Sequence, residues 1–172
     1  PHALIQMCKG DVVKAAKLYH QTFPKEKVTA LVDYHNDVIN DTLKLAKALN
    51  KDLGAVRVDT SKALIDKYFN NKSTKGFDPH GVCKELIFAL RNELDKHGYK
   101  HVKIVVSSSF TLEKIQEWVK KKVPVDIYGV GSALVVNTTS SFTGDLVMLD
   151  HKPEAKVGRK NIKSKRLKIV KL

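Results

Sequence analysis

Two short apolar runs in this sequence end in small hydroxyl and glycine residues, and a helix-like stretch follows the first of them. A loop of this kind exposes backbone N–H groups, and the positive end of the following helix adds to their attraction for a phosphate. The candidate phosphate-binding residues are Ser107, Ser108, Ser109, Gly129, Gly131 and Ser132. Two such loops, one strand–helix unit apart, predict a phosphorylated sugar or nucleotide as the ligand.

Charged side chains stand at the ends of two earlier apolar runs. Arg57 and Asp59 alternate with Val56 and Val58, so both are expected to point to the same side of one strand. Asp33 ends the preceding run in the same manner. An Arg–Asp pair at a strand end suits recognition of a base and a ribose. The same spacing also fits a structural ion pair, and Asp33 fits a turn or a helix cap.

The elements that must position these residues alternate between strand and helix. Strands are predicted over 27–33, 55–59, 102–106 and 125–132. Helices are predicted over 11–23, 37–49, 82–97 and 112–121, with Asp11 and Thr111 as caps of the first and last. This alternation predicts an α/β fold with a parallel sheet, in which the strand ends bearing Asp33, Asp59 and the two loops share one rim.

After Ser132 the helical period disappears, and segments 142–149 and 166–172 predict antiparallel strands joined through 151–153. We therefore expect 1–132 to form part of a (β/α) barrel and 133–172 to form a β-rich tail belonging to a second domain. Four strand–helix units are too few for an eight-stranded barrel, which typically needs about 250 residues. The sequence is interpreted as an incomplete part of a longer enzyme, with open sheet edges.

The composition is that of a globular domain, 42% hydrophobic and 28% charged, with a formal net charge of +13. Much of this charge lies in 151–172, where 166–172 nearly alternates apolar with basic residues. We interpret this stretch as a half-exposed strand, and nucleic acid is not an expected partner, because no aromatic residue is interleaved with the charge. No apolar run approaches the roughly 18 residues of a membrane span. Cys8 and Cys83 lack metal-ligand spacing, which favours free thiols in a cytoplasmic protein and no metal site made of side chains.

An ordered set of motifs resembles the nicotinate phosphoribosyltransferase family. The motifs are PHALIQ at 1–6, ALVD at 30–33, GAVRVDTS at 54–61, KHVKIVVS at 100–107 and YGVGS at 128–132. NDVIND at 36–41 and AKVGR at 155–159 also fit its bacterial branch. The resemblance covers essentially the whole sequence and is to the C-terminal portion of such an enzyme, which implies part of a type II phosphoribosyltransferase barrel.

The resemblance implies a transferase of NAD biosynthesis. Such an enzyme forms nicotinate mononucleotide and pyrophosphate from nicotinate and phosphoribosyl pyrophosphate, with Mg²⁺ and hydrolysis of ATP, and is commonly a homodimer. The positions that match its catalytic residues are His2, Arg57 and Asp59, of which His2 corresponds to a histidine that is phosphorylated. The positions that match substrate-binding residues are Asp33, Thr60 and Ser61.

Other functions remain open at this point. Quinolinate carries a second carboxylate, so a quinolinate phosphoribosyltransferase should need additional Arg or Lys at the base pocket, whereas nicotinamide lacks the acid altogether. A non-catalytic basic binding module on the same fold is a third alternative. The chain also departs from the family at 107–109, where relatives usually carry Ser-Gly-Gly. Because glycine permits a positive φ and close approach of phosphate, three serines predict weaker phosphate binding or a shifted loop.

Overall fold

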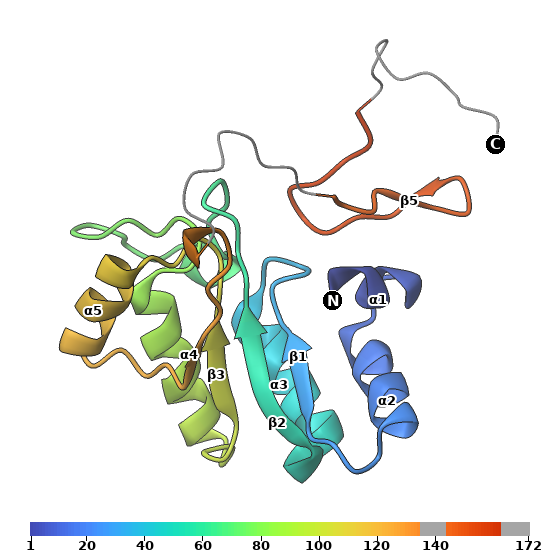
Figure 1. The fold of residues 1–172 in the computed structure, drawn as a ribbon, viewed down its shortest axis with the longest axis horizontal. Coiled ribbons are helices and arrows are strands. Elements are labelled where there is room, and N and C mark those ends of the chain that lie inside the picture. Colours follow the sequence, from blue (N-terminus) through green and yellow to red (C-terminus); the bar gives the residue numbers. More distant parts are fainter. Residues whose placement is uncertain (135–143, 163–172) are drawn as a thin grey trace.

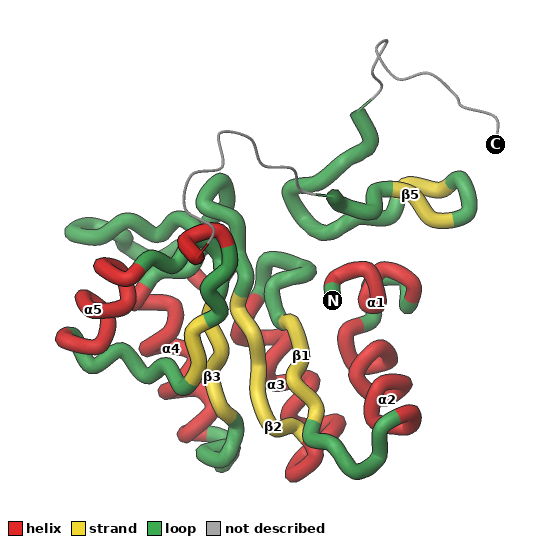
Figure 2. The backbone as a smooth tube through the Cα atoms, in the orientation of Figure 1, coloured by secondary structure: helices red, strands yellow, loops and turns green. Residues whose placement is uncertain are grey.

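A four-stranded parallel sheet forms the centre of the protein in the computed structural model, which describes residues 1–134 and 144–162 (Figures 1 and 2). Its strands, in spatial order, are β1 (Val28–Leu31), β2 (Leu53–Val58), β3 (Lys103–Val106) and β4 (Ile127–Tyr128). The helices are α1 (His2–Met7), α2 (Val12–Thr22), α3 (Val38–Leu49), α4 (Lys84–Lys96) and α5 (Leu112–Lys120). Short 3₁₀ turns lie at η1 (Asn50–Asp52), η2 (Lys67–Phe69) and η3 (Ser132–Leu134). The alternation of strand and helix confirms the predicted fold class.

Local capping explains where two of the helices begin. The Asp11 carboxylate accepts a hydrogen bond from the Lys14 N–H at 2.9 Å, and the Thr111 hydroxyl accepts one from the Lys114 N–H at 3.3 Å. Each bond satisfies a backbone donor that the first helical turn leaves without a partner. The predicted starts of α2 and α5 are therefore confirmed, within a residue or two at their ends.

The core lies between the sheet and the helices, which Figure 1 shows along one face of the strands. Val56 and Val58 of β2 are fully buried, and one face of α4 is formed by side chains with no exposed surface. Those α4 residues are Leu86, Leu90 and Leu94. Because strand side chains alternate between faces, burial of the two valines places Arg57 and Asp59 on the opposite face, as predicted.

The sheet register fixes which strand ends meet. The residues aligned across the four strands are Leu31, Arg57, Val105 and Ile127. The residues two positions further along are Asp33, Asp59, Ser107 and Gly129. All four therefore lie at the same rim of the sheet and alternate to the same face, as the sequence predicts.

The strands differ in length from the prediction. β1 ends at Leu31, two residues before the predicted end, and β3 begins one residue late. β2 begins at Leu53, two residues early, and β4 is confined to Ile127–Tyr128. The Asp126 carboxylate accepts the Ile104 N–H at 2.7 Å, so a side chain takes the place of a ladder bond just before β4. This local competition places the start of β4 after Asp126, later than the apolar run predicted.

The C-terminal segment forms a short antiparallel hairpin of β5 (Met148–Leu149) and β6 (Lys152–Pro153). Its turn residues, Asp150 and His151, have φ values of 49° and 61°, the left-handed values that two-residue hairpin turns require. The prediction that 151–153 is a connection is therefore wrong, because Lys152 and Pro153 already pair. The predicted strand at 166–172 lies outside the described residues, and the domain division at 132/133 stays a prediction.

Across the described parts of the chain, no helix has the length and apolar character needed to cross a membrane.

Candidate functional site

A cavity of about 370 Å³ opens at the rim between the ends of β2, β3 and β4. Its lining includes every residue that the sequence predicts to bind phosphate, together with Arg57 and Asp59. These residues come from three strand ends that the parallel register brings together. The predicted phosphate loops and the predicted Arg–Asp pair therefore face one space.

Arg57, Ser107 and Asp59 are joined by hydrogen bonds. The Arg57 Nε–H donates to the Ser107 hydroxyl at 2.9 Å, and that hydroxyl donates to Asp59 Oδ1 at 2.7 Å. Arg57 Nη2 lies 3.4 Å from Asp59 Oδ2. Guanidinium has five N–H donors, so most of those on Arg57 remain for a ligand, and its side chain is 43% exposed. The arrangement can present a cation and a carboxylate to different parts of one substrate.

The loop at 107–109 adopts the backbone conformation that glycine favours. Ser108 and Ser109 have φ values of 75° and 61°. For a residue with a Cβ, this left-handed backbone conformation costs roughly 1–2 kcal/mol. Across the cavity, a Cβ on Gly129 would lie 3.1 Å from the Ser107 Cβ, which is closer than an ordinary van der Waals contact. The small residues thus let the two loops approach each other closely.

Asp33 lies beside this cavity and is the centre of a buried ionic cluster. The His2 Nε2 atom lies 3.0 Å from Asp33 Oδ1, and the Lys156 ammonium donates to Oδ2. Burial alone would raise the pKa of Asp33. The hydrogen bond from His2 and the charge of Lys156 outweigh burial and hold the pKa below its usual value. Asp33 is thus ionised in the folded protein.

The cluster fixes how His2 is oriented. An ionised carboxylate only accepts hydrogen bonds, so the Nε2 atom facing Asp33 carries the proton and donates it. In the neutral ring, the Nδ1 atom then keeps its lone pair. His2 begins α1, and its side chain is 26% exposed. The structure therefore places the predicted catalytic histidine near the rim, with one nitrogen available for chemistry.

Lys156 connects the Asp33 cluster to β2. Its ammonium also donates to the Asp59 carbonyl oxygen at 3.3 Å, and its side chain is only 10% exposed. Sequence reasoning assigned no function to Lys156. The AKVGR motif at 155–159 is the one sequence feature that includes Lys156, and this motif gives no reason to expect contact with Asp33.

Backbone and side-chain contacts hold the segment that carries Lys156. The Tyr34 hydroxyl donates to Glu154 Oε1 at 2.6 Å, and the Val157 N–H donates to the Tyr34 carbonyl at 3.1 Å. Gln6 also donates to the Glu154 carbonyl. Burial, followed by the hydrogen bond to Glu154, raises the pKa of Tyr34. The hairpin segment is thus attached to the beginning of the chain and to the end of β1 (Figure 1).

Thr60 and Ser61 follow Asp59 directly but do not line the rim cavity. Thr60 is fully buried, and within the described ranges its hydroxyl has no hydrogen-bond partner. The Ser61 hydroxyl accepts a bond from the Ala63 N–H at 3.3 Å, as in a local turn. Their predicted role in substrate binding stays a prediction, and the geometry separates them from Arg57 and Asp59.

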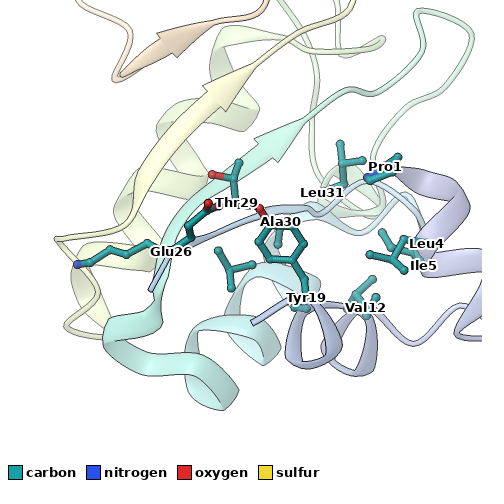
Figure 3. A pocket seen from close by; sticks show the side chains of 13 residues that line it. Pro1, Leu4, Ile5, Val12, Tyr19, Glu26, Thr29, Ala30 and Leu31 are labelled. Carbon is teal, nitrogen blue, oxygen red and sulfur yellow. Dashed lines mark hydrogen bonds between the residues drawn. The ribbon is translucent and has the colours of Figure 1, made fainter. Parts of the chain in front are cut away.

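A second, largely apolar cavity of about 270 Å³ lies between α1, α2 and β1 (Figure 3). Tyr19, Val12 and Ile5 point into it from the helices, and the Tyr19 hydroxyl donates to Glu26 at 3.0 Å. It contains none of the rim residues, so it does not extend the candidate site. Cys8 and Cys83 are free, as predicted, and both are buried. Residues 1–134 and 144–162 include no group of three His, Cys, Asp or Glu side chains placed to hold a metal ion.

The similarity of this chain to known proteins was found at the level of solved structures. No protein-family model and no curated protein matches the chain. Among solved structures, it is similar to the nicotinate-nucleotide pyrophosphorylase of Pyrococcus furiosus, with 35% sequence identity and a TM-score of 0.62. The match covers 93% of this chain and 36% of that one, so the chain spans about a third of the length of that enzyme. The described residues thus share an α/β fold with a parallel sheet with about a third of that enzyme.

Proposed function

We propose that this chain contributes the catalytic rim of a phosphoribosyltransferase that makes nicotinate mononucleotide from nicotinate and phosphoribosyl pyrophosphate. The observation that carries the proposal is the single cavity that Arg57 and Asp59 share with both small-residue loops. The similar Pyrococcus furiosus protein is named for a reaction of a nicotinate nucleotide with pyrophosphate, which supports the same chemistry.

Different residues of the rim cavity act on different parts of the substrate in the proposed reaction. Loss of pyrophosphate from the anomeric carbon leaves a positively charged, oxocarbenium-like ribose, which a carboxylate such as Asp59 stabilises. The backbone N–H groups of the two loops bind the phosphate at the other end of the ribose. Mg²⁺, when bound to the substrate phosphates, would supply positive charge to the departing pyrophosphate. Asp59, with its carboxylate 26% exposed, is suited to meet a metal carried by substrate phosphates and water.

We propose nicotinate as the base because the rim cavity has one cationic side chain and nicotinate has one carboxylate. Arg57 is the sole Arg or Lys among the described residues that line it. Guanidinium binds a carboxylate through two parallel hydrogen bonds. Quinolinate would bring a second carboxylate to the same space. Its phosphoribosyltransferase also yields a nicotinate nucleotide, so the neighbour's name makes quinolinate the second candidate.

His2 is the proposed site of coupling to ATP. With Nε2–H held by Asp33, the Nδ1 lone pair attacks the γ-phosphorus of ATP, the bond from that phosphorus to the bridging oxygen breaks, and ADP leaves. The Lys156 ammonium offsets the negative charge of Asp33 beside the ring. The homodimer implied by the resemblance is retained as part of the proposal.

The choice of base can be tested in the intact protein. Nicotinate, quinolinate and nicotinamide are each supplied with phosphoribosyl pyrophosphate and Mg²⁺, with and without ATP, and the nucleotide product is quantified. We expect nicotinate to be used best and ATP to increase its use. Conversion of quinolinate with release of CO₂, independent of ATP, would show that the second candidate is correct. Absence of product from all three bases would favour a non-catalytic module.

A further inference from the structure

A third cavity, of about 550 Å³, lies on the other side of Ser108 from the rim cavity. Ser108 lines both spaces. The walls come from the loop that follows β2, from the start of α4 and from α5 (Figure 1). Four lysines line it, and we call it the lysine cavity; they are Lys62, Lys84, Lys114 and Lys121.

Two of these lysines are paired with a carboxylate of the protein. The Lys84 and Lys121 ammonium groups lie 2.9 Å and 2.7 Å from the same oxygen of Glu117. A second acid of the lining, Asp78, is paired with His80 at 2.6 Å. Glu85 is the remaining acid of the lining. Apart from Lys62 and Lys114, the lining therefore holds two lysines and three carboxylates, of which Glu117 and Asp78 already have partners.

Lys114 has a different environment. Its ammonium lies over the rings of Phe110 and Trp118, 4.1 Å and 5.3 Å from their centroids, and no described carboxylate forms an ion pair with it. Burial lowers the pKa of Lys114, and the charge of Lys62 lowers it further. A half-buried ammonium with no anion beside it is costly, although the aromatic rings offset part of this cost.

We propose that Lys62 and Lys114 bind a phosphate-bearing anion in the lysine cavity, adjacent to the loop at 107–109. Two cations that form no ion pair among the described residues, a cavity between them and the adjacent Ser108 match the charge and hydrogen-bonding needs of a phosphate group. The volume exceeds what a single phosphate needs, so pyrophosphate and the polyphosphate of ATP are the two sources to compare. This site goes beyond the proposed function, which uses the rim cavity and His2.

Trp118 provides a direct probe, because it lines the cavity beneath Lys114 and is the single tryptophan of this sequence. Its fluorescence is followed in the intact protein while inorganic phosphate, pyrophosphate or ATP is added in separate titrations. Trp118→Phe identifies the part of the signal that belongs to this residue. We expect a saturable change with at least one polyphosphate, and the source that binds more tightly identifies the ligand.

The variants Lys62→Met and Lys114→Met should each raise the apparent Kd about tenfold or more, as expected for loss of a charge-assisted hydrogen bond. Lys120→Met is the matched control, since Lys120 is exposed on the same helix and does not line the cavity. Lys62 is also exposed, so its variant should fold normally. Unchanged Kd values in both lysine variants, or no Trp118 signal with any of the three anions, would overturn the proposal. Phosphoribosyl transfer is assayed separately, so either conclusion can fail alone.

Discussion

Hydrogen bonds at the rim join Arg57, Ser107 and Asp59. In the proposed reaction, Arg57 binds nicotinate and Asp59 acts on phosphoribosyl pyrophosphate. Arg57→Ala should lower kcat/KM for nicotinate by about 30- to 1000-fold, because a charge-assisted contact in a desolvated site is worth roughly 2–4 kcal/mol. Asp59→Asn should instead impair use of phosphoribosyl pyrophosphate, since it removes the charge that faces the ribose. Steady-state kinetics, with each substrate varied in turn, separates the two effects.

Lys103→Ala is a suitable control for these variants, because Lys103 is exposed at the opposite end of the sheet. It should leave both kcat/KM values unchanged. If Arg57→Ala and Asp59→Asn behave like this control, the pair is a structural ion pair, which is the alternative that the spacing alone also allowed.

The positive φ values at Ser108 and Ser109 lead to a prediction about stability. Ser108→Gly and Ser109→Gly should each raise the free energy of unfolding by up to about 1 kcal/mol, because relief of left-handed strain exceeds the entropy cost of glycine. Ser107→Gly should lower it, since this serine has no positive φ and loses two hydrogen bonds. Urea denaturation measures all three. Destabilisation by both Ser108→Gly and Ser109→Gly would show that their side chains stabilise the loop by more than the strain costs.

At the level of elements, α3 begins at a carboxylate that is remote in sequence. Asp66 is fully buried and accepts the Val38 N–H at 3.1 Å and the Tyr68 N–H at 2.8 Å, and thereby joins α3 to η2. Burial, opposed in part by these N–H groups, raises the pKa of Asp66 to about 6. Below this value the folded protein holds a proton that the unfolded chain releases near pH 4.

Stability should therefore fall as the pH rises from about 4 to about 6, since the folded state must give up a favoured proton. The contribution of Asp66 alone is on the order of 3 kcal/mol. Asp66→Asn should remove this part of the pH dependence, at the cost of one of the two hydrogen bonds. Unfolding free energies measured across this range test the prediction, and an identical slope in the variant would contradict it.

The elements differ in how far the sequence could predict them. Asp11 and Thr111 cap helices within three residues, so local pattern is enough to find them. The rim residues were also found, because strand ends in a parallel sheet meet at one edge and the register follows from alternation. The link from Asp66 to Val38 spans 28 residues, and the hairpin turn depends on positive φ at Asp150 and His151, which their residue types do not demand.

Across the whole molecule, Lys156 is the main contact between the C-terminal hairpin segment and the rim. It lies 123 residues from Asp33 in the sequence, so no periodicity or spacing could have paired them. Only the folded chain brings its ammonium to a carboxylate that is fully buried and already bonded to His2.

Removal of Lys156 should therefore have a large effect on stability. Lys156→Met leaves a buried, ionised Asp33 without its cation and should cost about 3–5 kcal/mol of unfolding free energy. Addition of Asp33→Asn should restore part of the loss, with a coupling energy of roughly 1–3 kcal/mol in a double-mutant cycle. Lys152→Met, an exposed change in β6 of the same segment, is the control. Strictly additive effects would show that Lys156 and Asp33 do not depend on each other.

Product formation at the rim cavity decides between an enzyme and a binding module. The intact protein is incubated with nicotinate, phosphoribosyl pyrophosphate, Mg²⁺ and ATP, and nicotinate mononucleotide and pyrophosphate are quantified over time. We expect equal amounts of the two products from the unmodified protein and from Lys103→Ala, with severe loss of both in Asp59→Asn. Absence of nicotinate mononucleotide from the unmodified protein, or full activity in Asp59→Asn, would contradict phosphoribosyl transfer at this site.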